Sequence, residues 1–237
     1  MKNILILGAG KSSSVLIEQL LQDAAAEGWK MTIGEQDPEK AKKLFSPSEQ
    51  LSIQELNADN AETLKAAIHA ADLVISMLPA GMHPKVAQVC LDENRHLITA
   101  SYVSDEMKKL DEAARKKGLL FLNEMGVDPG IDHMSAMQVI DRIRSQGGRM
   151  TAFESFTGGL LAPESEKDNP WKYKFTWNPR NVVLAGQGVV KFKQEGTYKY
   201  IPYHRLFRRT EVIQIPRYGY FEGYANRDSL KYLDAYN

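Results

Sequence analysis

The chain has 237 residues, of which 43% are hydrophobic and 25% charged, an ordinary globular composition with enough apolar material for two domains. Its 30 basic residues balance 30 acidic ones, so no excess charge draws it to nucleic acid or to an anionic membrane. The single cysteine excludes an internal disulfide and no apolar run approaches the ~20 residues of a membrane span, so we expect a cytoplasmic protein.

The first half of the chain alternates apolar runs with stretches of helical spacing. Strands are predicted at residues 3–7, 29–35, 51–56, 72–78, 96–101 and 119–123, of which 3–7 and 72–78 are apolar runs and 51–56 is the weaker prediction. Helices are predicted at residues 12–26, 39–44, 61–71, 84–92, 106–117 and 133–146, and Cys90 is expected to be a core residue of its helix. Strands separated by helices are typical of right-handed crossover units, so we predict an α/β Rossmann-type domain with a parallel sheet over residues 1–126.

Residues 151–237, which lie within a predicted second domain of residues 127–237, have a different texture, rich in aromatic side chains. Alternating stretches at residues 182–184 and 189–192 predict antiparallel strands, and residues 156–163 are expected to end a first strand. A new helix is expected to begin near residue 226, with no closing element after it. We therefore predict a second α+β domain that is incomplete, whose exposed strand edges would allow a homodimer.

A glycine-rich turn follows the first strand and opens the first helix. Gly8 permits the tight turn, and Gly10 lets the backbone approach a pyrophosphate, whose charge a helix N-terminus favours. The third fingerprint position, Ser13, is small enough for close helix–strand packing. The other predicted contacts with the dinucleotide phosphates are Lys11 and the hydroxyls of Ser12 and Ser13. The rival interpretation, a mononucleotide P-loop, does not match the spacing around Lys11.

The second strand ends in Glu35, about 20 residues beyond the glycines, where dinucleotide-binding domains carry an acidic residue. A carboxylate there accepts hydrogen bonds from the ribose hydroxyls and repels a 2′-phosphate. The next residue, Gln36, stands where an NADP enzyme often places arginine. Glu35 and Gln36 therefore favour NAD over NADP, and Asp37 is the alternative for the ribose contact.

Three later strand ends should open on the same crevice. Ser76 and Leu78 end the fourth strand and are expected to line the dinucleotide site. Tyr102 follows the fifth strand and Asp128 the sixth, and a phenol beside a carboxylate suits an acid, a base or an anchor.

Asp128 and two residues that follow it also have structural interpretations. Asp128 is alternatively part of a structural Asp-Pro-Gly turn. Asp132 is predicted to be a helix N-cap and His133 a packing residue. No His/Cys/Asp cluster has metal-ligand spacing, so no metal is expected.

Several runs together resemble saccharopine reductase, the glutamate-forming saccharopine dehydrogenase family. They are residues 76–79, 83–84, 101–104, 123–133, 158–160, 162–163, 168–170, 173–175, 177 and 224–229. The resemblance spans the whole chain, and the run from Asn123 to His133 is long and specific. Thr157 departs from the family, which often has cysteine there, so no role of that thiol applies.

The resemblance implies an NAD(P)-dependent oxidoreductase of lysine metabolism that acts on a C–N bond. Such enzymes interconvert saccharopine with glutamate plus 2-aminoadipate semialdehyde, and the small amino-acid substrate is the implied partner. Tyr102 and Asp128 are the implied catalytic candidates. The residues implied to contact the substrate are Ser101, Tyr102, Asp128 and Arg227, and those implied near the cofactor are Val127 and Trp177. The arginine would clamp a substrate carboxylate.

Two alternatives to this function stay open. One is a related imine reductase such as carboxynorspermidine synthase, and the other is a non-catalytic NAD-binding module. Family chains are longer than this one, so we expect the substrate domain to be truncated at its C-terminal side.

Overall fold

The computed structural model describes residues 2–165, 167–176, 179–185 and 188–236. They form two compact units, Met1–Ser135 and Ala136–Asn237, which are described separately below. Trp177, one of the predicted cofactor contacts, lies outside the described residues. No helix in the described ranges is both long and apolar enough to cross a membrane.

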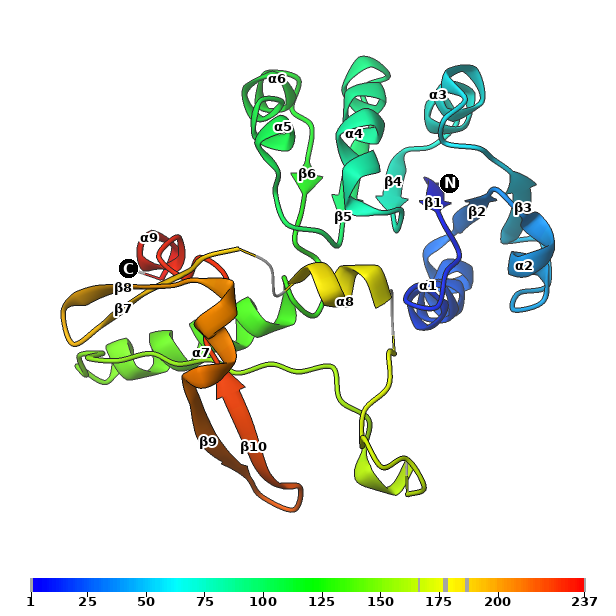
Figure 1. The fold of residues 1–237 in the computed structure, drawn as a ribbon. Helices are drawn as coiled ribbons and strands as arrows, with labels where there is room; N and C mark the ends of the chain where they lie inside the picture. The colour runs from blue at the N-terminus through cyan, green and yellow to red at the C-terminus, as the bar shows by residue number, and fades with distance from the viewer. Residues whose placement is uncertain (1, 166, 177–178, 186–187, 237) are drawn as a thin grey trace. The chain divides into compact units, whose positions relative to one another are not determined.

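A six-stranded parallel sheet forms the centre of the first unit (Figure 1). Its strands are β1 (Lys2–Leu7), β2 (Trp29–Glu35), β3 (Leu51–Glu55), β4 (Leu73–Ser76), β5 (His96–Thr99) and β6 (Phe121–Leu122). Their spatial order is β3-β2-β1-β4-β5-β6, which is the Rossmann order with its switch point between β1 and β4. The predicted fold class is confirmed.

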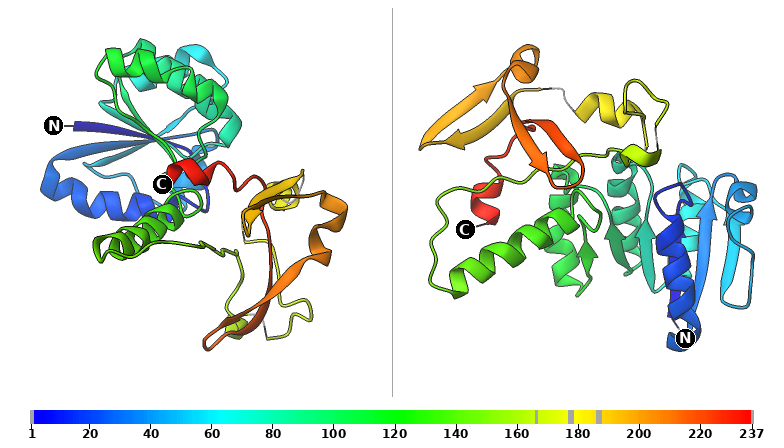
Figure 2. Two further views of the ribbon diagram at one scale, coloured as in Figure 1. Left: turned by 90° about the vertical axis from the view of Figure 1, so that its left-hand side faces the viewer. Right: turned by 90° about the horizontal axis from the view of Figure 1, so that it is seen from below.

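Helices cover both faces of this sheet, as Figures 1 and 2 show. On one side lie α1 (Ser14–Glu27) and α2 (Pro38–Lys42). On the other lie α3 (Ala61–His69), η1 (Ala80–Met82), α4 (His83–Asp92), α5 (Asp105–Lys108) and α6 (Asp111–Lys116). The single helix predicted at residues 106–117 is divided in two, and Met107 of the first part and Ala114 of the second are both buried.

Two apolar clusters form the core, one on each face of the sheet. Ile4 and Ile6 of β1 belong to one cluster, and the alternate residues Leu5 and Leu7 belong to the other. Because a strand points successive side chains to opposite faces, a strand buried on both sides is apolar throughout. Cys90 is fully buried, as predicted, and burial raises the pKa of its thiol to about 12.

The second unit contains two antiparallel hairpins and short helices. The helix α7 (Ile131–Ser145) spans the boundary between the two units. The elements that follow it are η2 (Pro163–Ser165), α8 (Pro179–Ala185), β7 (Val190–Gln194), β8 (Thr197–Ile201), η3 (Tyr203–Arg208), β9 (Thr210–Ile215), β10 (Gly219–Tyr224) and α9 (Tyr232–Ala235). The hairpins are β7–β8 and β9–β10. The antiparallel character predicted for this half is present.

Two predicted strands of the second unit are wrong. Residues 182–184 lie in α8, which begins at Pro179, because a three-residue apolar run cannot distinguish strand from helix and proline favours a helix start. Residues 156–162 form no strand.

The helix expected near residue 226 begins instead at Tyr232. The preceding segment is tied to β7, because the Lys191 N–H donates to the Arg227 carbonyl at 2.8 Å and the Ser229 N–H donates to the Lys191 carbonyl at 2.8 Å. The first bond uses the Arg227 carbonyl, which a helix over the same residues would need as an acceptor.

Candidate functional site

The turn between β1 and α1 has the geometry that a pyrophosphate needs. Gly8 has a φ of 93°, which favours glycine, and its N–H donates to the Gly34 carbonyl at 2.9 Å. Gly10 is exposed, and a Cβ added to it would meet no atom of the described chain within 4 Å. The surface beside Gly10 is therefore open to a ligand.

The side chain of Ser13 is buried within this turn and bonds to the turn's backbone. It is 1% exposed, and its hydroxyl donates to the Gly10 carbonyl at 2.9 Å. The predicted hydroxyl contact between Ser13 and a phosphate is therefore not available in this structure, although its small size serves the close packing. Lys11 and Ser12 are exposed on the same turn.

Glu35 joins the end of β2 to the glycine turn. One carboxylate oxygen accepts the Ala9 N–H at 2.8 Å, and the other accepts the Gln36 N–H at 3.0 Å. Carboxylate oxygens accept more than one hydrogen bond each, so lone pairs remain for the sugar hydroxyls of a dinucleotide. The contact between Glu35 and the ribose stays a prediction.

The end of β4 differs from the prediction in one respect. Leu78 lies beside Gly8, because a Cβ added to that glycine would come 3.5 Å from the Leu78 Cδ2. Ser76 is fully buried, so it offers no surface to a dinucleotide in this structure. Its side chain instead meets His83 at the start of α4.

His83 connects the ends of two strands. Its Nδ1 lies 3.0 Å from the Ser76 hydroxyl, and its Nε2 lies 2.9 Å from the hydroxyl of Ser101, which follows β5. The ring is 3% exposed, and burial holds the pKa of this imidazole below its ordinary value. From the sequence, His83 was assigned no role, although a histidine that opens an apolar helix shortly after a strand end was a visible signal.

Tyr102 and Asp128 are brought together, although they follow different strands. The Tyr102 hydroxyl donates to an Asp128 carboxylate oxygen at 2.5 Å, a short hydrogen bond typical of a hydroxyl paired with an anion. Tyr102 is partly buried and Asp128 is exposed. The pair is therefore reachable from solvent and already oriented.

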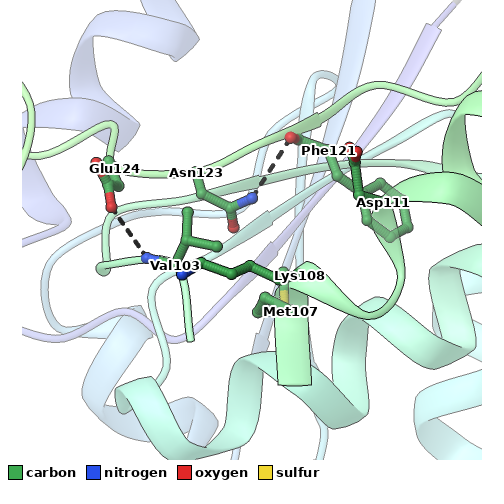
Figure 3. A pocket seen from close by; sticks show the side chains of 7 residues that line it. All are labelled: Val103, Met107, Lys108, Asp111, Phe121, Asn123 and Glu124. Carbon is green, nitrogen blue, oxygen red and sulfur yellow. Dashed lines mark hydrogen bonds between the residues drawn. The ribbon is translucent and has the colours of Figure 1, made fainter. Parts of the chain in front are cut away.

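Hydrogen bonds between the ends of β5 and β6 hold this pair in place. The Glu124 and Met125 N–H groups donate to the Ser101 and Thr99 carbonyls at 3.1 and 3.0 Å. The Glu124 carboxylate accepts the Val103 N–H at 3.0 Å (Figure 3). Sequence reasoning missed Glu124, since only the folded chain brings it next to residue 103.

Figure 3 shows a pocket beside these bonds. It is lined by Val103, Met107, Lys108, Asp111, Phe121, Asn123 and Glu124. These residues differ from those predicted for the site, so the pocket does not bear on the dinucleotide crevice.

The segment that carries Asp128 is a tight loop. The Gly126 N–H donates to the Pro129 carbonyl at 2.9 Å, and a Cβ added to Gly130 would come 2.1 Å from the Gly126 carbonyl oxygen. Val127 is 69% exposed beside Asp128. The glycine at position 130 is therefore required for the loop to close.

Asp132 was predicted to be the N-cap of the following helix, and this is wrong. The helix α7 begins at Ile131, so Asp132 lies inside its first turn. Its carboxylate accepts the Gly130 N–H at 2.8 Å and so reaches back to the loop.

The remaining predicted residue, Arg227, belongs to the second unit. It is exposed, and its φ is 40°. Among the described residues, no three His, Cys, Asp or Glu side chains are grouped in a way that could hold a metal ion.

The strand order, the glycine turn and Glu35 define a dinucleotide-binding domain of the Rossmann class. Residues 4–122 match the family model of the saccharopine dehydrogenase NADP binding domain, and residues 126–237 match that of the saccharopine dehydrogenase C-terminal domain. The chain therefore belongs to the saccharopine dehydrogenase family, as the sequence motifs indicated.

Individual relatives agree with this family. Saccharopine dehydrogenase [NADP(+), L-glutamate-forming] of Pyricularia oryzae is 35% identical over 235 residues, which are 99% of this chain and 51% of the relative. Alpha-aminoadipic semialdehyde synthase of Arabidopsis thaliana is 39% identical over 183 residues, 76% of this chain and 17% of the relative.

A solved structure, apo saccharopine dehydrogenase (L-Glu forming) from Saccharomyces cerevisiae, is similar to this chain with 33% sequence identity and a TM-score of 0.88. The match covers 100% of this chain and 52% of the chain in that structure. This chain thus spans about half the length of the glutamate-forming relatives.

Proposed function

We propose that this chain carries the dinucleotide site and part of the substrate site of an enzyme that interconverts saccharopine with glutamate plus 2-aminoadipate semialdehyde. The observation that supports it best is the Tyr102–Asp128 pair, set at the carboxyl edge of the sheet that also carries the glycine turn. The names of the relatives support the choice of substrate. A parallel sheet binds its ligands at this edge.

In this reaction a C–N bond of saccharopine is oxidised to an imine, which water splits to an amine and an aldehyde. The nicotinamide supplies the hydride chemistry. The chain's own residues must orient the substrate carboxylates and move a proton at the amine nitrogen. Ser101 and Arg227 are the proposed carboxylate contacts.

Tyr102 and Asp128 are the proposed proton-handling pair. The phenol donates its proton to Asp128, and a phenol oxygen can both donate and accept, so a substrate amine is a suitable donor to it. A proton released by the amine then passes to a carboxylate that is already in contact with the phenol. The pair therefore suits the removal of the amine proton in one direction and its return in the other.

The first experiment measures saccharopine-dependent formation of reduced nicotinamide by the wild type and by Tyr102→Phe and Asp128→Asn. We expect each substitution to lower kcat by about 100-fold or more without changing the dinucleotide Kd. Tyr198→Phe, on an exposed strand of the second unit, is the matched control. Wild-type rates in both site variants would remove the proposed roles.

The same assay separates the alternatives. Turnover with a diamine in place of glutamate in the reductive direction would favour the carboxynorspermidine type. Dinucleotide binding by the wild type without any turnover would favour the binding module.

We also propose that the chain prefers NAD to NADP, although the matched domain and the named relatives are of the NADP type. The Glu35 carboxylate at the turn would repel a 2′-phosphate, and Gln36 has no charge to balance one. Glu35→Arg should shift the ratio of the NAD and NADP dissociation constants toward NADP by about tenfold or more. Glu39→Gln, on the exposed side of α2, is the control, and an unchanged ratio in Glu35→Arg would contradict the assignment.

A further inference from the structure

A chain of three polar side chains lies beneath the proposed substrate site. The imidazole of His83 contacts the Ser76 hydroxyl through Nδ1 at 3.0 Å and the Ser101 hydroxyl through Nε2 at 2.9 Å. The neutral ring has one N–H donor and one acceptor nitrogen, whereas each serine hydroxyl can either donate or accept. Two arrangements of the protons are therefore possible, and they differ in which serine donates to the ring.

The burial of the two serines decides between these arrangements. Ser76 is 0% exposed, and the hydrogen-bond partner found for its hydroxyl among the described residues is the His83 ring. If Nδ1 carried the proton, the Ser76 hydroxyl proton would be buried without that acceptor, which costs free energy. Ser101 is only partly buried, so its hydroxyl proton can turn toward a ligand or solvent.

We propose that His83 is a positioning residue whose ring accepts from Ser76 at Nδ1 and donates from Nε2 to Ser101, so that the Ser101 hydroxyl proton is directed at an acceptor on the ligand. A carboxylate oxygen is such an acceptor, whereas a protonated amine is not. The inference rests on the proposed function in one respect only, namely that the ligand is a carboxylate-bearing amino acid. The tautomer itself is a property of the ligand-free protein.

Burial of the ring also keeps it in the neutral form that both tautomers share and that this assignment requires. Burial of the ring disfavours its charged form and lowers the pKa of His83 below 6.5, so the ring is neutral at neutral pH. A neutral ring keeps one donor and one acceptor, which the relay needs. The adjacent residue, Tyr102, follows Ser101 directly, so the relay also helps to orient the segment that carries the proposed proton-handling pair.

The direct test is ¹⁵N NMR of histidine-labelled full chain without ligand at neutral pH. The protein has 5 histidines, and comparison with His83→Gln assigns the signals of this ring. We expect a pyridine-like shift for Nδ1 and a pyrrole-like shift for Nε2. The opposite pattern, or a ring protonated at both nitrogens, would overturn the proposal whether or not saccharopine binds.

The second test measures the Kd of saccharopine by calorimetry with the dinucleotide present. Ser101→Ala should weaken saccharopine binding roughly tenfold, because it removes a hydrogen bond to a charged group. Ser135→Ala, on an exposed turn of α7, is the control and should bind like the wild type.

Replacing the ring itself separates its two nitrogens. In His83→Gln the side-chain amide retains a donor near the Nε2 position, so the Kd of saccharopine should stay close to the wild-type value. In His83→Asn the shorter side chain retains only the hydrogen bond with Ser76, so saccharopine binding should weaken several-fold. Unchanged dinucleotide affinity shows that each variant is folded. Equal affinity for saccharopine in Ser101→Ala and the wild type would overturn the donor role of Ser101, while a wild type that binds no saccharopine would instead contradict the proposed function.

Discussion

Gly8 and Gly10 stand in one turn for different physical reasons. Gly8 has a φ of 93°, where a side chain is strained, so glycine is needed for folding. Gly10 has open space where a Cβ would stand, so glycine there is needed only if a ligand approaches. The structure therefore separates a folding role from a binding role at two positions that look alike in the sequence.

Gly10→Val should fold normally and lose most of its dinucleotide affinity. The valine side chain would occupy the space through which the pyrophosphate approaches the backbone. Calorimetry with NAD and NADP measures the affinity, and thermal unfolding measures stability. Gly8→Ala serves as the contrast, with an expected loss of stability of about 1 kcal/mol or more. Wild-type affinity in Gly10→Val would contradict the location of the phosphate site.

His83 should make the protein less stable in mild acid. Burial lowers its pKa in the folded state below the ordinary 6.5, so the unfolded chain binds more protons between the two values. The contribution of His83 to the free energy of unfolding is therefore complete above about pH 6.5 and is lost as the pH falls toward the folded pKa. Denaturant unfolding from pH 7 to pH 5 should show this fall in the wild type and less of it in His83→Gln. An equal fall in the free energy of unfolding with pH in the two proteins would exclude His83 as the cause of the lower stability in acid.

At the scale of elements, sequence periodicity predicted the alternating strands and helices of the first unit well. The strand at residues 29–35 was predicted with its observed bounds, because apolar and polar residues alternate from Trp29 to Ile33 and the polar Glu35 ends the pattern. The helix predicted at residues 106–117 was not continuous, and the structure divides it into α5 and α6. Local patterns therefore locate an element more reliably than its breaks.

The start of α3 offers a test at this scale. The Asn60 side chain accepts the Glu62 and Thr63 N–H groups at 3.0 and 3.2 Å and so satisfies two donors of the first turn. Asn60→Ala should lower the free energy of unfolding by about 1 kcal/mol. Asn60→Asp keeps an acceptor at the same place and should stay near the wild type in the same denaturant titration. An unchanged free energy of unfolding in Asn60→Ala would mean that water replaces the Asn60 side chain as the cap.

At the scale of the whole molecule, the first unit carries its own core together with the predicted phosphate and ribose contacts. Both apolar clusters of the sheet, the glycine turn and Glu35 lie within Met1–Ser135. The boundary predicted at residue 126 would cut the loop in which Gly126 bonds to Pro129, whereas a boundary at residue 135 keeps it.

A fragment of residues 1–135 should therefore fold alone and bind the dinucleotide with nearly the affinity of the full chain. Circular dichroism during heating should show one cooperative transition, and calorimetry should show binding. A fragment of residues 1–126, which loses the closed loop, is the comparison and should be less stable. An unfolded 1–135 fragment would show that the second unit is needed for the fold of the first.

The sequence by itself determined the strand–helix alternation, the glycine turn, the acid at the end of β2 and the family, because each depends on residues close together in the chain. Only the tertiary structure decided that Tyr102 contacts Asp128, that His83 joins two serines, and that Ser76 is hidden from the crevice. The physical reason is distance along the chain. Hydrogen bonds between the ends of neighbouring strands join residues that a whole helix separates, and burial depends on what the rest of the fold places on top.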